Sequence, residues 1–292
     1  MAAFKTVGLV ARSGSDLITE SFRRVEHFLR DRQVEVLVED SALPMLIRQD
    51  AAVCSRETMG ERCDLVIAVG GDGNMLGAAR SLVSHGVPIL GVNRGRLGFL
   101  ADVSPEEIEI SLGSVLAGDF TVEEHFLLEG DKSPDDNGDL PCALNEVVIH
   151  AANLPKMLEF NLYIDEAFVF NQYSDGLIVS TPTGSTAYAL SAGGPIMHPS
   201  LDAIALVPMF PHSLNSRPLV VKGESSIRVE IGSHVETHAK VSFDSQIEFD
   251  VGPGESITVR KKKERLKLIH PPGHNFYEVC RSKLDWASRM GE

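Results

Sequence analysis

The apolar positions of the first 120 residues follow the periods of strands and helices in turn. Four segments carry the apolar runs or alternation of strands: 5–11, 34–38, 65–69 and 88–92. Residues 15–30 have apolar side chains at helical spacing, and residues 50–59 are expected to form a loop or a helix. Strands that alternate with helices predict a right-handed, Rossmann-like α/β domain with a parallel sheet.

From about residue 121 the pattern changes to short strands and turns. Strands are expected at 119–122, 126–128, 147–149, 158–164, 167–171, 176–181, 219–221, 226–231, 240–243, 247–251, 256–260 and 265–269. The Lys-rich residues 261–264 are expected at a solvent-facing hairpin tip, and the acidic residues 131–139 in a turn around an Asn-Gly pair. The sequence therefore predicts a two-domain α+β protein.

The expected domains are an α/β domain over 1–120 and a β-rich, mostly antiparallel domain over 121–270. The tail 271–292 is expected to pack back on the first domain.

The most informative stretch is the turn Gly70-Gly71-Asp72-Gly73, between the buried run 65–69 and a helix-favouring segment. Glycines let a ligand oxygen approach backbone N–H groups at the positive end of a helix, which describes a phosphate cradle. A carboxylate there repels phosphate unless a metal neutralises the charge or a substrate hydroxyl donates to it. The turn therefore indicates phosphoryl transfer to an alcohol.

A structural alternative is that Asp72 or Asn74 caps the helix. Two other phosphate loops are excluded, because Leu76 stands where the dinucleotide fingerprint G-x-G-x-x-G needs its third glycine, and no P-loop motif occurs. A second glycine loop, 93–99, carries Arg94 and Arg96. It is interpreted either as a phosphate contact or as a solvated basic loop.

Composition and charge limit the classes of partner and the compartment that can be expected for the protein. The 292 residues are 43% hydrophobic and 23% charged, as in an ordinary globular protein. The formal charge of −14 argues against nucleic acid or an anionic membrane as partner and favours small molecules. The four cysteines lack C-x-x-C spacing, which argues against a cysteine zinc site or a disulfide framework. Without a signal-peptide pattern or an apolar run long enough to span a bilayer, the protein is expected in the cytoplasm.

The segment 175–195 is expected to have the same strand–turn–helix arrangement as the Gly70–Gly73 turn, with a Gly/Ser/Thr loop before a helix that begins near Thr186. Its hydroxyls and N–H groups suit ribose or pyrophosphate oxygens, and Tyr188 suits stacking on a base. Asn145-Glu146 offers an amide and a carboxylate for a base edge or a ribose diol. The alternatives are a capped helix and a solvated strand end. His198 and His212 lack a nearby acid or thiol in sequence and are expected to be structural.

The chain resembles the bacterial NAD kinase family over nearly its whole length. The resemblance rests on the motifs above, on their order in the sequence, and on the segments 93–100, 208–212 and 268–271. GGDG alone is moderately specific, since lipid kinases and phosphofructokinases share it. The combination with Thr-Gly-Ser-Thr-Ala-Tyr at 183–188 is highly specific.

The resemblance implies a dinucleotide held between the two domains while ATP, with Mg²⁺ or another divalent cation, phosphorylates the 2′-hydroxyl of its adenosine ribose. It implies that Asp72 is the general base and that homodimers or homotetramers complete each site. The implied NAD contacts are Asp72, Gly73, Asn145, Glu146, Lys156, Tyr173, Asp175, Thr186, Ala187, Tyr188, Ala189, Leu190, Ser191 and Gln246. The implied phosphate contacts are Gly70, Gly71, Gly73, Asn74 and Arg94. Tyr173 and His125 stand where family members often carry basic residues.

Three other readings compete. A lipid kinase with GGDG predicts an exposed apolar groove instead of a hydroxyl-rich loop. A non-catalytic NAD-binding regulator binds the dinucleotide without transferring phosphate, and a hydride-transfer enzyme lacks its fingerprint here. The choices of NAD or NADH and of ATP or polyphosphate stay open at this point.

Overall fold

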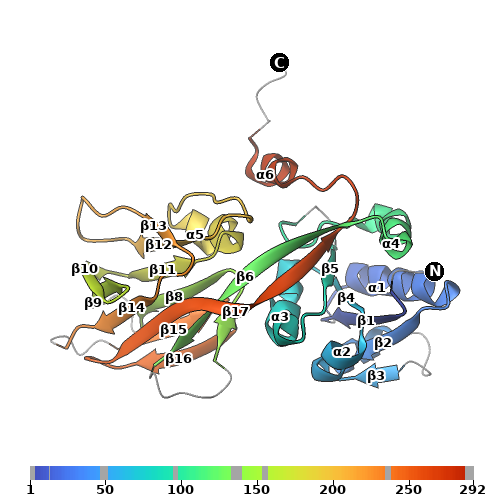
Figure 1. The fold of residues 1–292 in the computed structure, drawn as a ribbon, viewed down its shortest axis with the longest axis horizontal. Helices are drawn as coiled ribbons and strands as arrows, with labels where there is room; N and C mark the ends of the chain where they lie inside the picture. The colour runs from blue at the N-terminus through green and yellow to red at the C-terminus, as the bar shows by residue number, and fades with distance from the viewer. Residues whose placement is uncertain are drawn as a thin grey trace. The chain divides into compact units, whose positions relative to one another are not determined.

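The computed structural model describes residues 4–12, 14–46, 52–94, 98–132, 140–152, 157–233 and 238–286. The chain forms two compact units, residues 1–124 with 265–292 and residues 125–264 (Figure 1). It passes from one unit to the other within β6 (Thr121–Asp131) and returns within β17 (Ser256–His270). The predicted architecture of an α/β domain and a β-rich domain is confirmed, while the domain limits expected from the sequence remain a prediction.

The first unit is built on a parallel sheet with the order β3-β2-β1-β4-β5, and the end of β17 pairs parallel to β5. The strands are β1 (Thr6–Ala11), β2 (Glu35–Glu39), β3 (Ala52–Cys54), β4 (Leu65–Val69) and β5 (Ile89–Val92). β4 and β5 are buried at every position, which explains their continuous apolar sequences. The parallel sheet expected from alternating strands and helices is therefore present.

Helices lie on both faces of this sheet. They are α1 (Asp16–Asp31), α2 (Arg56–Arg62), α3 (Asp72–Leu82) and α4 (Ile108–Ala117), with 3-10 turns at Asp40–Met45, Val83–His85 and Pro105–Glu107. A further helix, α6 (Phe276–Leu284), follows β17 in the chain. α1 and α4 pack together on one face and share an apolar core with β1 and β4 (Figure 1). On the other face, Met59 of α2 lies against Gly8 of β1, and α2 packs against α3. Ser15 caps α1 by accepting the Ile18 N–H at 3.3 Å.

The second unit has a six-stranded antiparallel sheet, β13-β12-β11-β8-β15-β16, and an antiparallel layer β10-β9-β14-β17. Its strands are β7 (Cys142–Ala143), β8 (Glu146–Ala151), β9 (Leu158–Ile164), β10 (Ala167–Ser174), β11 (Gly176–Ser180), β12 (Ala203–Met209), β13 (Leu219–Lys222), β14 (Ile227–Ile231), β15 (Ala239–Phe243) and β16 (Ile247–Val251). Phe160 of β9 and Phe243 of β15 are fully buried in one core shared by the two layers.

The strand limits expected around charged residues were wrong. Residues 121–122 and 126–128 belong to one strand, β6, which does not include 119 and 120, and 261–264 continue β17 instead of forming a hairpin tip. Lys261 is only 9% exposed because its Nζ lies 2.7 Å from Asp202 Oδ1 and 2.8 Å from Glu224 Oε1. These ion pairs let a Lys-rich run remain in a strand.

Several elements were not expected from the sequence. Residues 52–54 form β3 before α2 begins, 108–117 form α4, 142–143 form β7, 203–209 form β12 and 276–284 form α6. Pro208 pairs with Leu177 of β11 but lies beyond residues 203–206, which pair with β13, so on the β13 side no ladder needs its missing N–H. Most of the predicted acidic turn, 133–139, lies outside the described residues. None of the helices in the described ranges has the length and apolar character that crossing a bilayer requires.

Candidate active site

The turn between β4 and α3 is shaped by its glycines. Gly70 has φ of +145°, a conformation that glycine adopts readily, and an added Cβ there would collide with the Asn74 side chain. The Asn74 amide nitrogen donates to the Val69 carbonyl at 2.9 Å. The helix begins at Asp72, with Gly71 as N-cap and no side-chain capping hydrogen bond. Helix capping therefore does not account for the carboxylate at this turn.

Asp72 is half-buried, and its carboxylate faces the loop that follows β5. Its oxygens lie 3.4 Å from the backbone nitrogen of Phe99 and 3.3 Å from that of Leu100, which are long distances for hydrogen bonds. Gly98 lies so close that an added Cβ would collide with the carboxylate. Because its existing donors are weak, the carboxylate retains the capacity to accept a stronger one, such as an alcohol.

A cavity of about 460 Å³ opens at this turn within the first unit. It is lined by the glycine turn, a carboxylate, two cationic side chains and their neighbours: Ser15, Leu17, Gly71, Asp72, Asn93, Arg94, Gly98 and Lys283. An added Cβ at Gly71 or Gly73 would meet no atom within 4 Å, so the backbone is open on that side. Bare backbone and two cations suit a phosphate chain.

The two cations reach the cavity from distant parts of the sequence. Arg94, which follows β5, is where a phosphate contact was expected, whereas Lys283 in the last turn of α6 was missed. Asn93 shapes the loop by donating to the Ala101 carbonyl at 3.2 Å and accepting the Arg94 N–H at 2.7 Å. Residues 95–97, including the second arginine of this loop, lie outside the described part of the chain.

In the second unit, Asn145 and Glu146 lie at the start of β8, beside the turn between β15 and β16. The Asp244 carboxylate accepts the backbone N–H groups of Leu144, Asn145 and Glu146 at 2.9, 2.9 and 3.3 Å. Asp244 was not among the residues predicted from the sequence, whereas Gln246, which is exposed in the same turn, was. Asp244 thus fixes the backbone that carries the predicted dinucleotide contacts.

Glu146 is a buried carboxyl group. It is 6% exposed, and its Oε2 atom has no hydrogen-bond partner among the described residues. Burial, and after it the charge of Asp244, raise the pKa of Glu146 to about 8, although the hydrogen bond from the Tyr188 backbone N–H acts in the opposite direction. The side chain is therefore mostly protonated at neutral pH and offers a ligand an O–H donor as well as an acceptor.

We expect Glu146→Gln to remove a pH dependence of stability. The folded pKa of about 8 exceeds the ordinary value of 4.5, so the native state keeps a proton that the unfolded state loses. The free energy of unfolding should fall by up to about 1.4 kcal/mol per pH unit between these two values and then level off. Urea unfolding at pH 5 and pH 8 should show the variant gaining relative stability at pH 8. The exposed Glu248→Gln serves as control, and parallel pH curves for wild type and Glu146→Gln would contradict the assignment.

Two hydroxyls of the Gly/Ser/Thr loop in segment 175–195 bind backbone groups of the loop and of neighbouring segments. Thr181 Oγ1 donates to the Leu144 carbonyl at 2.6 Å and accepts the Gly184 N–H at 3.0 Å. Ser185 Oγ accepts the Met197 N–H at 2.9 Å, and both hydroxyl residues are fully buried. These two hydroxyls hold the loop in place, so their density alone was a poor sign of ribose or pyrophosphate binding.

The helix expected near Thr186 is a 3-10 turn, Thr183–Thr186, followed by the single-turn helix α5 (Tyr188–Ser191). The Tyr188 ring is 45% exposed and accessible for stacking. Ala189 is buried in a small apolar core, so only its backbone can face a ligand. The other predicted contacts of this segment are half-buried or exposed: Thr186, Ala187, Leu190 and Ser191.

Two predicted contacts lie at the far end of β11. Glu146 pairs with the last residue of β11, whereas Asp175 precedes its first residue. Tyr173 is 45% exposed and borders a cavity of about 570 Å³ in the second unit. Within this unit the structure brings Asn145 and Glu146 together but does not bring Tyr173 and Asp175 to them. Lys156 lies outside the described residues.

Histidines of this unit make local contacts. His125 is 4% exposed, and its Nδ1 lies 2.8 Å from Thr183 Oγ1. His198 Nδ1 lies 2.8 Å from Ser200 Oγ. The backbone N–H of His212 donates to the Tyr173 carbonyl at 2.9 Å. The His198 contact is local, as expected for a structural residue, and His125 supports the 3-10 turn. The His212 contact involves only its backbone, so a structural role for its ring stays a prediction.

Comparison with known proteins identifies the family. Models of the ATP-NAD kinase N-terminal and C-terminal domains match residues 7–120 and 144–271. The NAD kinase of Pseudomonas aeruginosa strain PAO1 is 51% identical over 292 residues, and that of Azotobacter vinelandii is 51% identical over 295 residues. Each match covers 100% of this chain and 99% of the relative.

Two solved structures of similar fold also come from NAD or NADH kinases. A yeast NADH kinase complexed with NADH has a TM-score of 0.87 at 26% identity, over 99% of this chain and 90% of the yeast chain. An NAD kinase from Archaeoglobus fulgidus in complex with ATP has a TM-score of 0.75 at 28% identity, over 95% of this chain and 99% of the archaeal chain. With both domain models matched and relatives at 51% identity over its full length, the chain belongs to the NAD kinase family of phosphotransferases.

Proposed function

We propose that the protein transfers the γ-phosphoryl group of ATP to the 2′-hydroxyl of the adenosine ribose of NAD, giving NADP and ADP. The observation that carries the proposal is the Asp72 carboxylate in a cavity whose lining includes open glycine backbone and two cations. A carboxylate is out of place in a pure phosphate site and suits one in which an alcohol loses a proton.

In this mechanism Asp72 is the general base. It accepts the proton of the 2′-hydroxyl while that oxygen bonds to the γ-phosphorus and the bond to the ADP oxygen breaks. The bare backbone at Gly70, Gly71 and Gly73, together with Asn74 and Arg94, holds the phosphates. Phosphoryl transfer requires little covalent participation, so positioning and charge stabilisation carry most of the rate enhancement.

A divalent cation fits this cavity as a companion of ATP. Mg²⁺ binds through one or two carboxylates together with substrate phosphates and water, and Asp72 is the one carboxylate among the described lining residues. When bound, the cation neutralises triphosphate charge. The donor set of the chain therefore suits a metal that arrives with the nucleotide.

The dinucleotide would be held by the Asn145, Glu146 and Tyr188 group, with Gln246 and Lys156 as further proposed contacts. Neutral Glu146 would donate to or accept from a ribose hydroxyl or a base edge.

Asp175 and Tyr173 lie at the other end of β11, which supports a homodimer or homotetramer in which a second copy supplies them. The four free cysteines support a reducing compartment, the cytoplasm.

The deciding assay incubates the purified full chain with NAD, ATP and MgCl₂ and measures NADP by mass spectrometry. Formation of NADP that requires all three additions is expected. Parallel reactions with NADH and with polyphosphate determine the acceptor and the donor. Binding of NAD without any NADP would instead indicate a non-catalytic regulator, and phosphorylation of a lipid alcohol would indicate a lipid kinase.

We expect Lys283→Met to raise the KM for ATP by about tenfold with little change in kcat, because loss of one charge-assisted phosphate contact costs about 1.5 kcal/mol. Lys283→Arg should retain most of the affinity. Lys267→Met, at an exposed lysine of β17 that does not line the cavity, is the matched control. Equal KM values for the Lys283→Met and Lys267→Met variants would remove Lys283 from the proposed phosphate site.

A further inference from the structure

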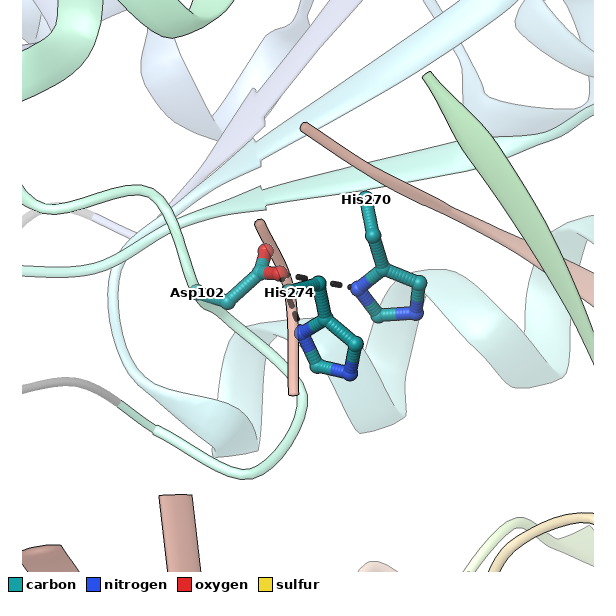
Figure 2. Close-up of side chains that lie close together, drawn as sticks. All are labelled: Asp102, His270 and His274. Carbon is teal, nitrogen blue, oxygen red and sulfur yellow. Dashed lines mark hydrogen bonds and ion pairs between the residues drawn. The ribbon is translucent and has the colours of Figure 1, made fainter. Parts of the chain in front are cut away.

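A compact group of two imidazoles and a carboxylate lies in the first unit, apart from the Asp72 cavity. Asp102 follows β5, His270 ends β17, and His274 follows in the turn that leads to α6. Asp102 Oδ2 lies 2.8 Å from Nδ1 of His270 and 2.8 Å from Nδ1 of His274 (Figure 2). The three side chains are only 7%, 3% and 17% exposed, respectively.

The arrangement has the donor chemistry of a metal site. The two rings stack with centroids 3.8 Å apart, so both Nδ1 atoms face the same carboxylate oxygen (Figure 2). One donor atom from each residue lies within 4.8 Å of the others. Two imidazole nitrogens with one carboxylate oxygen suit zinc or another late divalent transition metal better than Mg²⁺ or Ca²⁺, which prefer oxygen ligands.

The surroundings complete such a site. His270 Nε2 lies 3.4 Å from Glu123 Oε2, which is the outer carboxylate that orients a metal-bound imidazole in many proteins. Asp102 Oδ1 is buried and has no hydrogen-bond partner among the described residues. A small cavity of about 190 Å³ borders Asp102 and His274 and includes Glu107 and Glu278 in its lining. It leaves room for a water molecule as fourth ligand.

We propose that Asp102, His270 and His274 form a three-ligand site for one divalent transition metal ion of the zinc type. Tetrahedral zinc, with bonds of about 2.0–2.2 Å, separates its ligand atoms by roughly 3.3 Å. Binding therefore widens the present 2.8 Å contacts by about half an ångström and replaces two hydrogen bonds with metal bonds. The site ties the turn 271–274, and with it the start of α6, to the loop after β5.

This inference does not depend on the kinase reaction. The Asp72 cavity and the small cavity beside the histidines share no lining residue. The residues were not singled out from the sequence, because the carboxylate stands 168 positions before the first histidine of the group. A metal here would have a structural role in holding the C-terminal helix.

The test is a Co²⁺ titration of the chelator-treated, dialysed full chain, followed by displacement with Zn²⁺. The wild type should bind one equivalent, show the visible absorption of tetrahedral Co²⁺, and lose it when Zn²⁺ is added. His274→Asn should weaken binding by more than about 100-fold, because loss of a direct ligand exceeds the effect of an outer-shell partner. His27→Asn is the matched control, since His27 also pairs with an aspartate but lies exposed on α1.

Asp102→Asn is the second variant, because it preserves the shape of the carboxylate and covers the case in which His274→Asn fails to fold. Zn²⁺ should raise the thermal midpoint of the wild type and of His27→Asn but of neither cluster variant. Absence of stoichiometric Co²⁺ binding by the wild type, or equal binding by the cluster variants and the control, would overturn the proposal. The group would then be a carboxylate that bridges two imidazoles by hydrogen bonds.

Discussion

Replacing Asp72 with asparagine is expected to lower kcat by about 10²–10⁴-fold, the range typical for loss of a general base. Asparagine keeps the shape of the side chain and one oxygen that can accept from the N–H group of Phe99 or of Leu100, each of which faces a different carboxylate oxygen in the wild type. It cannot take up the proton of the ribose hydroxyl. Because the dinucleotide contacts are proposed to lie mainly elsewhere, the affinity for NAD should change little.

Steady-state kinetics of Asp72→Asn and calorimetric titration with NAD alone separate these two effects. The matched control is Asp64→Asn, because Asp64 also accepts two backbone N–H groups, from Lys5 and Thr6, at the opposite end of β4. That variant should retain wild-type kcat. Weakened NAD binding by Asp72→Asn with unchanged turnover would show that the carboxylate binds the substrate and does not act as a base.

The parts of the fold that depend on local pattern were predictable. Apolar runs such as 65–69 indicate buried strands because a parallel sheet covered on both faces tolerates no polar position. β17 was divided wrongly because its lysines look solvent-facing in sequence. The acidic partners of Lys261 come from Asp202 and Glu224, 59 and 37 positions earlier in the chain. Pairing at that distance cannot be read from a local window.

The residues of the candidate site also fall into those that the local sequence predicts and those that it does not. Gly70 to Gly73 could be recognised because a positive φ and an open backbone require glycine at particular positions of the turn. Asp244 and Lys283 could not, because each reaches its position through tertiary folding. Asp244 binds backbone nitrogens about 100 residues earlier, and Lys283 meets the Asp72 cavity from the last turn of α6. The hydroxyls of Thr181 and Ser185 led to the opposite error. Their positions in the sequence suggested contacts with a ligand, but in the structure they hold the backbone of the loop in place.

The Gly/Ser/Thr loop in segment 175–195 has a position where even one added methyl group should lower the stability of the protein. Gly184 lies against the backbone of Asn145, and an added Cβ would collide with its carbonyl and Cα atoms. Backbone cannot move aside as a flexible side chain can. The loop at 183–186 and the start of β8 would therefore have to separate, although hydrogen bonds from Thr181 to Leu144 and Asn145 join them.

We expect Gly184→Ala to destabilise the protein by about 2–3 kcal/mol, the upper part of the range for overpacking. The KM for NAD should rise as well, because Asn145 and the segment after Gly184 carry proposed dinucleotide contacts. Gly113→Ala is the control, since a Cβ on that glycine of α4 makes only an ordinary 3.9 Å contact with Phe28. It should stabilise the helix by about 0.5–1 kcal/mol. Urea unfolding of both variants measures the difference, and an unchanged midpoint for Gly184→Ala would contradict the close packing of these two segments.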